Sequence, residues 1–503
     1  MFRIFGPPGT GKTTTLLNMV DDALEKGVSP QSIAFLAFTR KAANEAKERA
    51  ALRFGLDPKT DLVNFRTLHS MALMYSGIRP DEVMQSENYR ELATATGVSL
   101  LTDNVSNDDD LIEASKASDP ILGLINLARL KKTSLRAEYD RSNLDEDWVK
   151  VDYLAKSLHN YKQRFGLYDF TDMLQVFIDN PQVCPHFELT FLDEAQDLSP
   201  MQWDIAHILD AKSDKMYVAG DDDQAIYRWA GADVDHFINL PGGSETLSQS
   251  FRVPKSVHML AENVANRIQR RFPKRYDPRE EMGRVARCAS VDELDMAHGS
   301  WLVLSQAGYQ LQPVANDLKA NGYLFNYRGS RSVSEKVSAA VNGWEQLRKG
   351  QEIKGETARR IYSYMSTGSR IARGFKKLPG VEDNQMLNLA QLQLQHGLVV
   401  GDELIWHEAM DKLPERDRAY IVAMLRRGEK FNGVPRITVS TIHGSKGGEA
   451  DNVVLFTDLS PAADADMRVN ADDVHRMFYV GVTRTKKNLY IVEPEDISRS
   501  YDL

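Results

Sequence analysis

Eight consecutive residues near the N-terminus have the composition and spacing of a phosphate-binding loop. They match the pattern G-x-x-x-x-G-K-[ST], in which glycines let the backbone approach closely and point its N–H groups at the β- and γ-phosphates. The N-terminus of the following helix adds partial positive charge. Lys12 is expected to neutralise the phosphates, and the Thr13 hydroxyl is expected to bind Mg²⁺. The loop consists of Gly6, Pro7, Pro8, Gly9, Thr10, Gly11, Lys12 and Thr13.

A phosphate-binding loop also needs a carboxylate for the metal at the end of another strand. The apolar run 189–192 ends in Asp193 and Glu194. Asp193 is expected to serve the metal, and Glu194 to orient and deprotonate an attacking water. An apolar run ending in Asp-Glu is a weak signal alone and becomes strong only beside the loop. A further run, 216–219, leads to Gln224, which could contact both the water and the γ-phosphate. Hydrolysis at the γ-phosphate is the implied reaction.

Two aromatic residues, Tyr227 and Trp229, follow Gln224 closely. Aromatic rings beside a phosphate sensor favour a platform on which nucleic-acid bases stack, a contact worth about 1–3 kcal/mol per base. The alternative is that both rings belong to the core, which is the commoner role of such residues without other context. The adjacent polar residues and glycine favour the platform.

The positioning of these side chains requires strands and helices, and the sequence predicts both. Short apolar runs typical of buried parallel strands occur at 2–5, 33–38, 189–192, 216–219, 302–304, 453–456 and 489–492. A helix is expected from about residue 12 to residue 26, ended by Gly27. Strands that alternate with helices predict an α/β fold with two doubly wound parallel sheets, one before and one after about residue 245.

Two helical stretches interrupt this alternation, and we expect each to be inserted into one of the sheets. The first domain is predicted at 1–70 and 161–244, with its insertion at 71–160. The second is predicted at 245–344 and 433–503, with a short insertion at 345–432. The first insertion contains an acidic segment, 103–110, which is expected to be a surface loop.

Composition limits the classes of protein that remain. A chain of 503 residues is too long for one compact core. Its net charge of −9 argues against a histone-like coat but permits an enzyme with a local basic track. Two cysteines, Cys184 and Cys288, are too few for a disulfide framework or a cysteine-rich metal site. No apolar run reaches the roughly 20 residues of a membrane helix, and no signal peptide is evident. We expect a cytoplasmic protein without membrane contact.

Ordered blocks between residues 6 and 484 resemble the UvrD/Rep/PcrA-type helicases of superfamily 1. Besides the phosphate loop, the resemblance is carried by FTRKAA at 38–43, TLHS at 67–70, DFTD at 169–172, DEAQ at 193–196, GDDDQAIY at 220–227, SFR at 250–252, TIHGSKG at 441–447 and YVGVTR at 479–484. All of these blocks occur in the family's order.

The resemblance implies two RecA-like motor domains, each with an insertion, that bind ATP and Mg²⁺ between them. It implies that Arg252 and Arg484 come from the second domain as arginine fingers, which stabilise charge that develops on the phosphoryl group. Glu449 resembles the family's ribose-contacting glutamate. The catalytic residues implied are Lys12, Asp193, Glu194, Gln224, Arg252 and Arg484, with Thr13 and Asp193 at the metal.

The resemblance also implies that the chain moves along single-stranded DNA and acts at junctions with duplex DNA. Closing and opening of the nucleotide cleft would move the two domains along the strand, with a 3′ to 5′ polarity expected from the family. The expected DNA-binding residues are Phe38, Thr67, His69, Tyr227, Trp229 and His443. Repair, replication and recombination are all compatible with such a motor.

Several positions depart from the family pattern. We expect the chain to lack the family's leading segment with its adenine-reading glutamine. Thr14 stands where many members have arginine, and Phe251 stands where tyrosine is usual. We therefore expect weak discrimination among nucleoside triphosphates, with Thr14 and Phe251 still at the nucleotide. Ala230 and Leu68 replace an arginine and a phenylalanine that are common in the family. The short second insertion suggests good translocation with poor unwinding.

Other classes of function fit these residues less well than a DNA motor does. A helicase–nuclease is disfavoured because no carboxylate-rich nuclease segment is evident. An NTPase that remodels proteins would keep the phosphate loop but would not need the aromatic block after Gln224. A binding module with dead chemistry is disfavoured because Lys12, Asp193, Glu194 and Arg484 are present. A related motor that acts on RNA or moves 5′ to 3′ remains an alternative.

Overall fold

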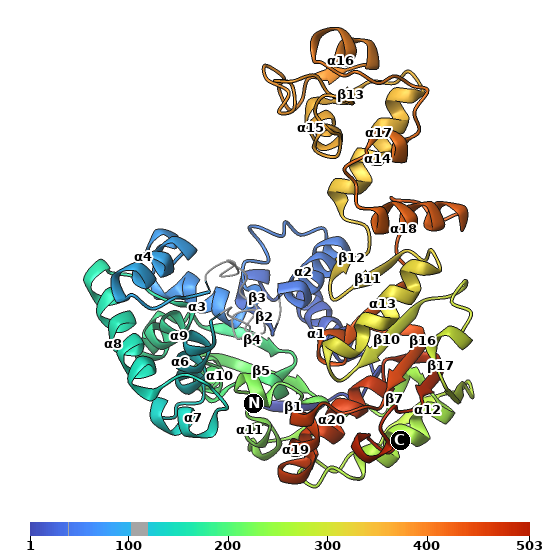
Figure 1. The fold of residues 1–503 in the computed structure, drawn as a ribbon. Helices are drawn as coiled ribbons and strands as arrows, with labels where there is room; N and C mark the ends of the chain where they lie inside the picture. Colours follow the sequence, from blue (N-terminus) through green and yellow to red (C-terminus); the bar gives the residue numbers. More distant parts are fainter. Residues whose placement is uncertain (39, 102–118) are drawn as a thin grey trace. The chain divides into compact units, whose positions relative to one another are not determined.

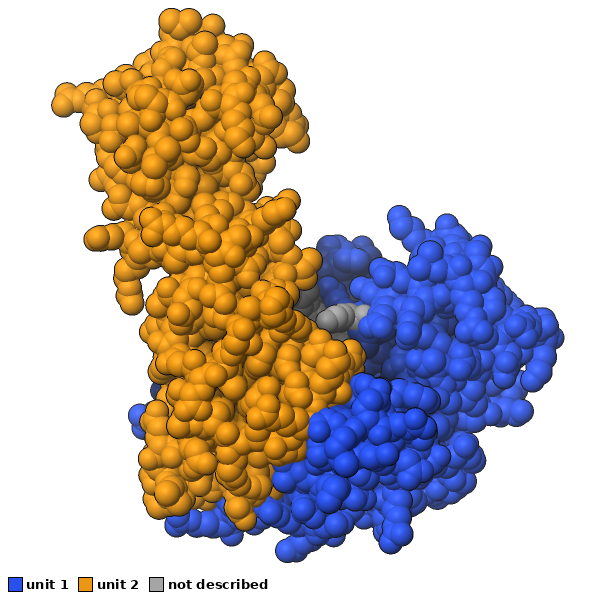
Figure 2. Space-filling view, turned by 90° about the vertical axis from the view of Figure 1, so that its right-hand side faces the viewer, with its two compact units in different colours: residues 1–283, 465–484 blue, residues 284–464, 485–503 orange. Residues whose placement is uncertain are grey.

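The computed structural model describes residues 1–38, 40–101 and 119–503, and the chain forms two compact units (Figures 1 and 2). The first unit consists of Met1–Gly283 and Ala465–Arg484, and the second consists of Arg284–Asp464 and Thr485–Leu503. The acidic segment 103–110 lies outside the described residues. Within the described ranges, no helix has both the length and the apolar character needed to span a bilayer.

The first unit is built on a sheet of parallel strands in the order β3-β2-β4-β5-β1-β6. The strands are β1 Phe2–Phe5, β2 Ile33–Ala37, β3 Phe65–Thr67, β4 Phe187–Leu192, β5 Ser213–Gly220 and β6 Ser244–Thr246. Because the strands are parallel, their carboxyl ends meet at one edge of the sheet. The phosphate loop after β1, the Asp193 segment after β4 and the Asp221 segment after β5 all leave from that edge.

Both faces of the sheet are buried at β2, which explains why this strand is apolar throughout. Ile33 and Phe35 of β2 belong to one hydrophobic cluster, together with residues of α1 and α2. Ala34 and Leu36 of the same strand belong to another cluster, with residues of α9 and α10. Successive strand residues point to opposite faces. In a strand that helices cover on both sides, every side chain is therefore buried, and apolar residues are favoured at each position.

The helices of the first unit before residue 245 include the layers on this sheet and the insertion (Figure 1). They are α1 Lys12–Glu25, α2 Arg40–Phe54, α3 Leu68–Ser76, α4 Ser86–Thr96, α6 Pro120–Leu130, α7 Leu135–Arg141, α8 Trp148–Phe165, α9 Phe170–Asp179, α10 Pro200–Ala211 and α11 Val234–Asn239.

The first unit continues beyond residue 245, the domain boundary that the sequence predicts. Its remaining elements are β7 Gln249–Pro254, α12 Lys255–Ala265, β8 Asp277–Arg279 and α20 Ala471–Val482. The physical reason lies in hydrogen bonds: the Phe251 N–H donates to the Gly9 carbonyl oxygen at 2.8 Å, and the Gln269 N–H donates to the Asp472 carboxylate at 2.8 Å. The first bond holds β7 against the phosphate loop, and the second holds α20 against the residues that follow α12.

The second unit contains a second sheet, in the order β12-β11-β15-β10-β16-β17-β9. Its strands are β9 Arg284–Cys288, β10 Trp301–Ser305, β11 Phe325–Tyr327, β12 Ser330–Arg331, β15 Ile437–Thr441, β16 Ala450–Phe456 and β17 Thr485–Val492. Their pairings are parallel except between β11 and β12. The prediction of an α/β fold with two mainly parallel sheets is confirmed.

Short helices and a small antiparallel pair complete the second unit. The helices are α13 Leu311–Ala320, α14 Glu335–Arg348, α15 Gly355–Ser363, α16 Leu389–Gln395, α17 Trp406–Ala409 and α18 Glu415–Arg426, and α19 Pro461–Val469 crosses into the first unit. The small pair is β13 Ile353–Lys354 with β14 Met386–Leu387. One hydrophobic cluster joins the sheet to the insertion, because it contains Phe325 of β11, Trp344 of α14 and Leu392 of α16.

Candidate nucleotide site

The phosphate loop between β1 and α1 adopts a conformation that requires glycine. Gly9 and Gly11 have φ angles of 72° and 79°, in the left-handed region that residues with a Cβ rarely adopt. A Cβ on Gly9 would lie 2.3 Å from the Cβ of Arg252, so the available space also excludes a side chain. Helix α1 begins at Lys12, and the Lys12 Nζ donates a hydrogen bond to the Gly6 carbonyl oxygen at 3.0 Å. The lysine therefore lies along the loop that it is predicted to serve.

Thr13 and the two carboxylates after β4 lie against this loop. The Thr13 Oγ1 donates to the Asp193 Oδ2 at 2.7 Å, and the Lys12 Nζ is 3.7 Å from the Glu194 Oε1. Burial and the neighbouring Glu194 raise the pKa of Asp193 to about 6. Glu194 has a φ angle of 57°, which is unusual for a residue with a side chain and is typical of strained positions at functional sites.

The chemistry of these oxygen donors fits Mg²⁺. A threonine hydroxyl and a carboxylate that lie 2.7 Å apart are hard oxygen ligands, which this ion prefers. Mg²⁺ is usually held by one or two protein ligands, with waters and substrate phosphates completing its shell. Among the described residues, no group of three or more His, Cys, Asp or Glu side chains is arranged to hold a metal ion. Thr13 and Asp193 therefore suit a metal that arrives with the nucleotide.

Gln224 lies at the end of β5 and contacts two charged side chains. Its Nε2 donates to the Asp221 Oδ2 at 2.7 Å, and its Oε1 accepts a hydrogen bond from the Arg484 Nη2 at 2.5 Å. Gln224 and Arg484 are both buried. The Asp221 N–H donates in turn to the Gln196 Oε1 at 3.0 Å, and the Gln196 Nε2 donates to Glu194. The segments after β4 and β5 are thus joined by side-chain hydrogen bonds.

The segment of β7 around Arg252 lies directly on the phosphate loop. The Ser250 Oγ donates to the Pro8 carbonyl oxygen at 2.7 Å, and the Phe251 N–H donates to the Gly9 carbonyl oxygen at 2.8 Å. The Phe251 ring is 73% exposed, so it is available to a ligand. We expected Arg252 and Arg484 to come from the second domain, but both lie in the compact unit that contains the loop.

The aromatic residues after Gln224 differ in exposure. Tyr227 is 4% exposed and stacks on Phe38, with ring centroids 5.9 Å apart and an interplanar angle of 18°. Trp229 is 46% exposed and meets Tyr227 edge to face, with centroids 6.2 Å apart. Tyr227 fits the core alternative in this structure, whereas Trp229 presents its ring to solvent as a stacking platform requires.

The remaining predicted residues lie at the start of α3, in the second unit and on the first turn of α1. Thr67 and His69 are buried at the start of α3, where the Thr67 Oγ1 accepts a hydrogen bond from the Ser70 N–H and caps the helix. His443 and Glu449 lie in the second unit, where Glu449 is exposed and pairs with Lys486 at 2.5 Å. Thr14 is exposed on the first turn of α1.

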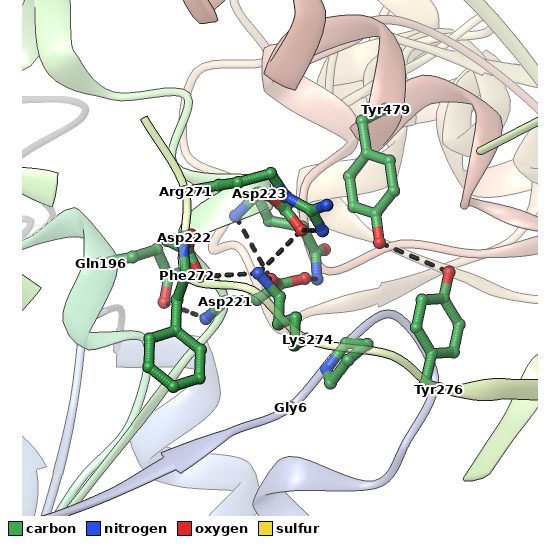
Figure 3. A network of polar contacts seen from close by, with 12 residues as sticks. Gly6, Gln196, Asp221, Asp222, Asp223, Arg271, Phe272, Lys274, Tyr276 and Tyr479 are labelled. Carbon is green, nitrogen blue, oxygen red and sulfur yellow. Dashed lines mark hydrogen bonds and ion pairs between the residues drawn. The ribbon is translucent and has the colours of Figure 1, made fainter. Parts of the chain in front are cut away.

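A buried ionic network behind residues 221–224, which we call the sensor segment, was missed by sequence reasoning (Figure 3). Asp221, Asp222 and Asp223 surround the Lys274 Nζ, and Arg271 pairs with Asp223. Burial alone would lower the pKa of Lys274, but the three carboxylates outweigh it and raise the pKa above its ordinary value. A run of three aspartates after a buried strand indicates that basic side chains pair with their carboxylates. The sequence does not show which of many basic residues supply them.

Comparison with known proteins identifies the family of this chain. The UvrD/REP helicase N-terminal domain model matches residues 2–242, and the UvrD-like helicase C-terminal domain model matches residues 436–492. The two matches together cover more than half of the chain. The chain belongs to the UvrD-like family of superfamily 1 helicases.

Relatives of this UvrD-like chain include two bacterial proteins named ATP-dependent DNA helicase PcrA. The chain is 30% identical over 289 residues to that of Bacillus subtilis, and the match covers 53% of this chain and 37% of the relative. It is 27% identical over 288 residues to that of Staphylococcus aureus strain NCTC 8325, and here the match covers 54% and 38%. The UvrD-like chain therefore matches less than two fifths of the length of these relatives.

Proposed function

We propose that this UvrD-like chain hydrolyses Mg·ATP to move along single-stranded DNA in the 3′ to 5′ direction and to unwind duplex DNA at junctions. The observation that carries the proposal is the hydrogen bond from Arg484 to Gln224, in the compact unit that also pairs Thr13 with Asp193. Family membership and relatives named ATP-dependent DNA helicase support the choice of substrate.

In the proposed site, neighbouring groups have separate roles in binding the phosphates, holding the metal and accepting a proton. The backbone N–H groups of the loop and Lys12 bind the phosphates, while Thr13 and Asp193 hold the metal. Mg²⁺, when bound, neutralises charge on the β- and γ-phosphate oxygens. Glu194 accepts the proton of the attacking water, and Lys12 lies 3.7 Å from its carboxylate. This division places the general base one residue from a metal ligand.

Arg252 and Arg484 supply positive charge where negative charge develops on the phosphoryl group. Arg484 also binds the Gln224 Oε1, so the amide that would contact the attacking water is linked to an arginine finger. A change in nucleotide state at Gln224 therefore reaches α20, the helix that precedes Arg484. Coupling of hydrolysis to movement would begin at this pair.

The test of this proposal is the rate of ATP hydrolysis with and without single-stranded DNA. We expect single-stranded DNA to stimulate hydrolysis, and we expect Lys12→Ala and Glu194→Gln each to abolish hydrolysis while DNA binding is retained. Partial duplexes with 3′ or 5′ single-stranded tails would then report polarity, with unwinding expected only from the 3′ tail. Hydrolysis that single-stranded DNA does not stimulate, or that responds only to RNA, would overturn the proposal.

The exposed ring of Trp229 supplies a second test, of coupling. Trp229→Ala should lower the rate of strand displacement by about fivefold or more, the loss of about 1–3 kcal/mol of stacking, while hydrolysis without DNA is unchanged. The matched control is Tyr309→Ala, which removes another exposed aromatic ring from the second unit. Wild-type displacement by Trp229→Ala would refute the stacking role.

A further inference from the structure

An irregular segment, residues 271–276, packs against three parts of the nucleotide site. We call it the strap. Its Phe272 ring stacks on Phe5, the last residue before the phosphate loop, with centroids 4.0 Å apart and an interplanar angle of 6°. Its Tyr276 hydroxyl oxygen lies 3.4 Å from that of Tyr479 in α20. Between these two contacts, Lys274 points into the aspartate run that precedes Gln224 (Figure 3).

Lys274 is the centre of the strap's contact with the sensor segment. Its side chain is 1% exposed, and its Nζ lies 3.1 Å from Asp221, 2.6 Å from Asp222 and 2.7 Å from Asp223. All three aspartates are fully buried. Asp222 and Asp223 have further partners in the strap, since the Phe272 N–H donates to Asp222 at 2.7 Å and Arg271 binds Asp223 through two nitrogens. A single ammonium group therefore serves three buried carboxylates.

Asp221 differs from the other two aspartates because it also contacts the sensor. One of its carboxylate oxygens faces Lys274 at 3.1 Å, and the other accepts a hydrogen bond from the Gln224 Nε2 at 2.7 Å. The other end of the same amide accepts a hydrogen bond from Arg484 at 2.5 Å. A continuous line of contacts thus runs from Lys274 through Asp221 and Gln224 to Arg484. Each contact in the line fixes the orientation of the next polar group.

We propose that Lys274 is a positioning residue for nucleotide hydrolysis, because it holds Asp221 in the place where that carboxylate orients the Gln224 amide toward Arg484. This inference rests on the proposed function and adds a residue to its machinery. Lys274 does not touch the nucleotide in this scheme. It acts by keeping the amide nitrogen of Gln224 on Asp221, so that the amide oxygen is turned toward Arg484.

A purely structural role of Lys274 makes a different prediction, and a second substitution separates the two. Lys274→Met removes the cation and leaves three buried carboxylates with Arg271 as their remaining cationic side-chain contact, which is expected to lower stability. Adding Asp222→Asn leaves two carboxylates with one cation, and so restores the wild-type excess of one carboxylate among these groups. The double variant should recover thermal stability. It should not recover orientation of Gln224, because the contact between Lys274 and Asp221 is still missing.

The experiment compares wild type, Lys274→Met, Lys274→Met/Asp222→Asn and Lys274→Arg. The matched control is Arg275→Met, which removes an exposed cation from the next residue of the strap. The measurements are thermal stability, kcat and KM for ATP with single-stranded DNA, and affinity for Mg·ADP with and without aluminium fluoride. The fluoride complex imitates the transferring phosphoryl group that Gln224 and Arg484 face, whereas ADP alone does not.

We expect both Lys274→Met variants to lose about tenfold or more in kcat, with KM and ADP affinity within about threefold of wild type. Their gain in affinity on adding fluoride should fall by a similar factor, and Lys274→Arg should recover part of both losses. Arg275→Met should match wild type. Recovery of kcat together with stability in the double variant, or an undiminished fluoride effect, would overturn the inference.

The same measurements distinguish a failure of the proposed function from a failure of the inference about Lys274. A wild-type protein that binds Mg·ADP with fluoride but does not hydrolyse ATP contradicts the proposed function, and the fluoride effect still decides the role of Lys274. A wild-type protein that binds no nucleotide contradicts both.

Discussion

Asp193 lies where a carboxylate is costly to ionise, and this predicts a pH dependence for the proposed metal site. Burial and the adjacent Glu194 raise its pKa to about 6. A proton and Mg²⁺ compete for the same oxygens, so metal affinity should be highest above pH 6 and should fall about tenfold per pH unit below it. Mn²⁺ binding in the presence of saturating ADP, followed by electron paramagnetic resonance at pH values from about 5 to about 8, measures this dependence.

The control for the pH dependence is Asp193→Asn, which removes the titrating group from the metal site. This variant should bind Mn²⁺ weakly at every pH in the range. A wild-type affinity that does not change between pH of about 5 and about 8 would contradict the assignment of Asp193 as a metal ligand.

Residues of the site were predictable to the extent that a local pattern defines them. The loop and Lys12 follow from spacing, and Asp193 follows from its place at a strand end. Arg484 lies 260 residues from Gln224, so only the family resemblance pointed to it. Lys274 was missed, because one lysine among many basic residues carries no local sign that three buried aspartates will surround it. Chain folding alone brings these groups together.

At the level of elements, a buried ionic cluster fixes the helical insertion to α9. Arg129 of α6 contacts Asp169 at 3.0 Å and Asp172 at 2.5 Å, and Lys162 of α8 contacts both carboxylates. Burial would raise the pKa of Asp169, but Arg129 and Lys162 outweigh it and hold the pKa at about 2. This pKa of Asp169 lies below the ordinary value of 3.8. The stabilisation that the ionised Asp169 contributes to the folded state is therefore complete above pH 3.8 and is lost as the pH falls toward 2.

Arg129→Met should therefore lower the free energy of unfolding by about 2–3 kcal/mol at neutral pH. Loss of a partner leaves buried charge uncompensated, and the remaining Lys162 limits the cost. Chemical denaturation measures the change. Lys156→Met is the control, because its pair with Asp152 on α8 is exposed and should contribute about 0.5 kcal/mol or less. Equal effects of the two substitutions would contradict a special role for the buried cluster.

Strands that are covered on both faces were the most predictable elements. The apolar runs at 2–5, 189–192 and 453–456 all lie within observed strands, because the buried part of a parallel strand is mostly apolar. β7 and β8 were not predicted, since they pair only with each other among the described strands and carry polar residues. Their place against the phosphate loop depends on tertiary contacts, which a periodic pattern does not report.

At the scale of the whole molecule, the chain passes between its two compact units at 283–284, 464–465 and 484–485. Each unit has its own buried core, with Phe191 in the first and Phe325 in the second. Units with separate cores unfold locally with separate free energies. Phe191→Ala and Phe325→Ala should each destabilise one unit by about 3–5 kcal/mol and leave the other unchanged.

Hydrogen exchange followed by mass spectrometry would assign each loss of stability to a unit. Phe325→Ala should accelerate exchange in 284–464 and 485–503, and Phe191→Ala should accelerate it in 1–283 and 465–484. Acceleration in both units by either substitution would mean that the two cores unfold as one.

The last crossing of the chain falls beside the sensor. Arg484 is the final residue of the first unit, and Thr485 begins β17, an interior strand with parallel neighbours on both sides. A strand held by two ladders cannot slide without its sheet, and a planar peptide bond leaves few torsions to absorb a displacement. The residue whose guanidinium contacts Gln224 is therefore joined by a single peptide bond to a strand that can move only with its sheet.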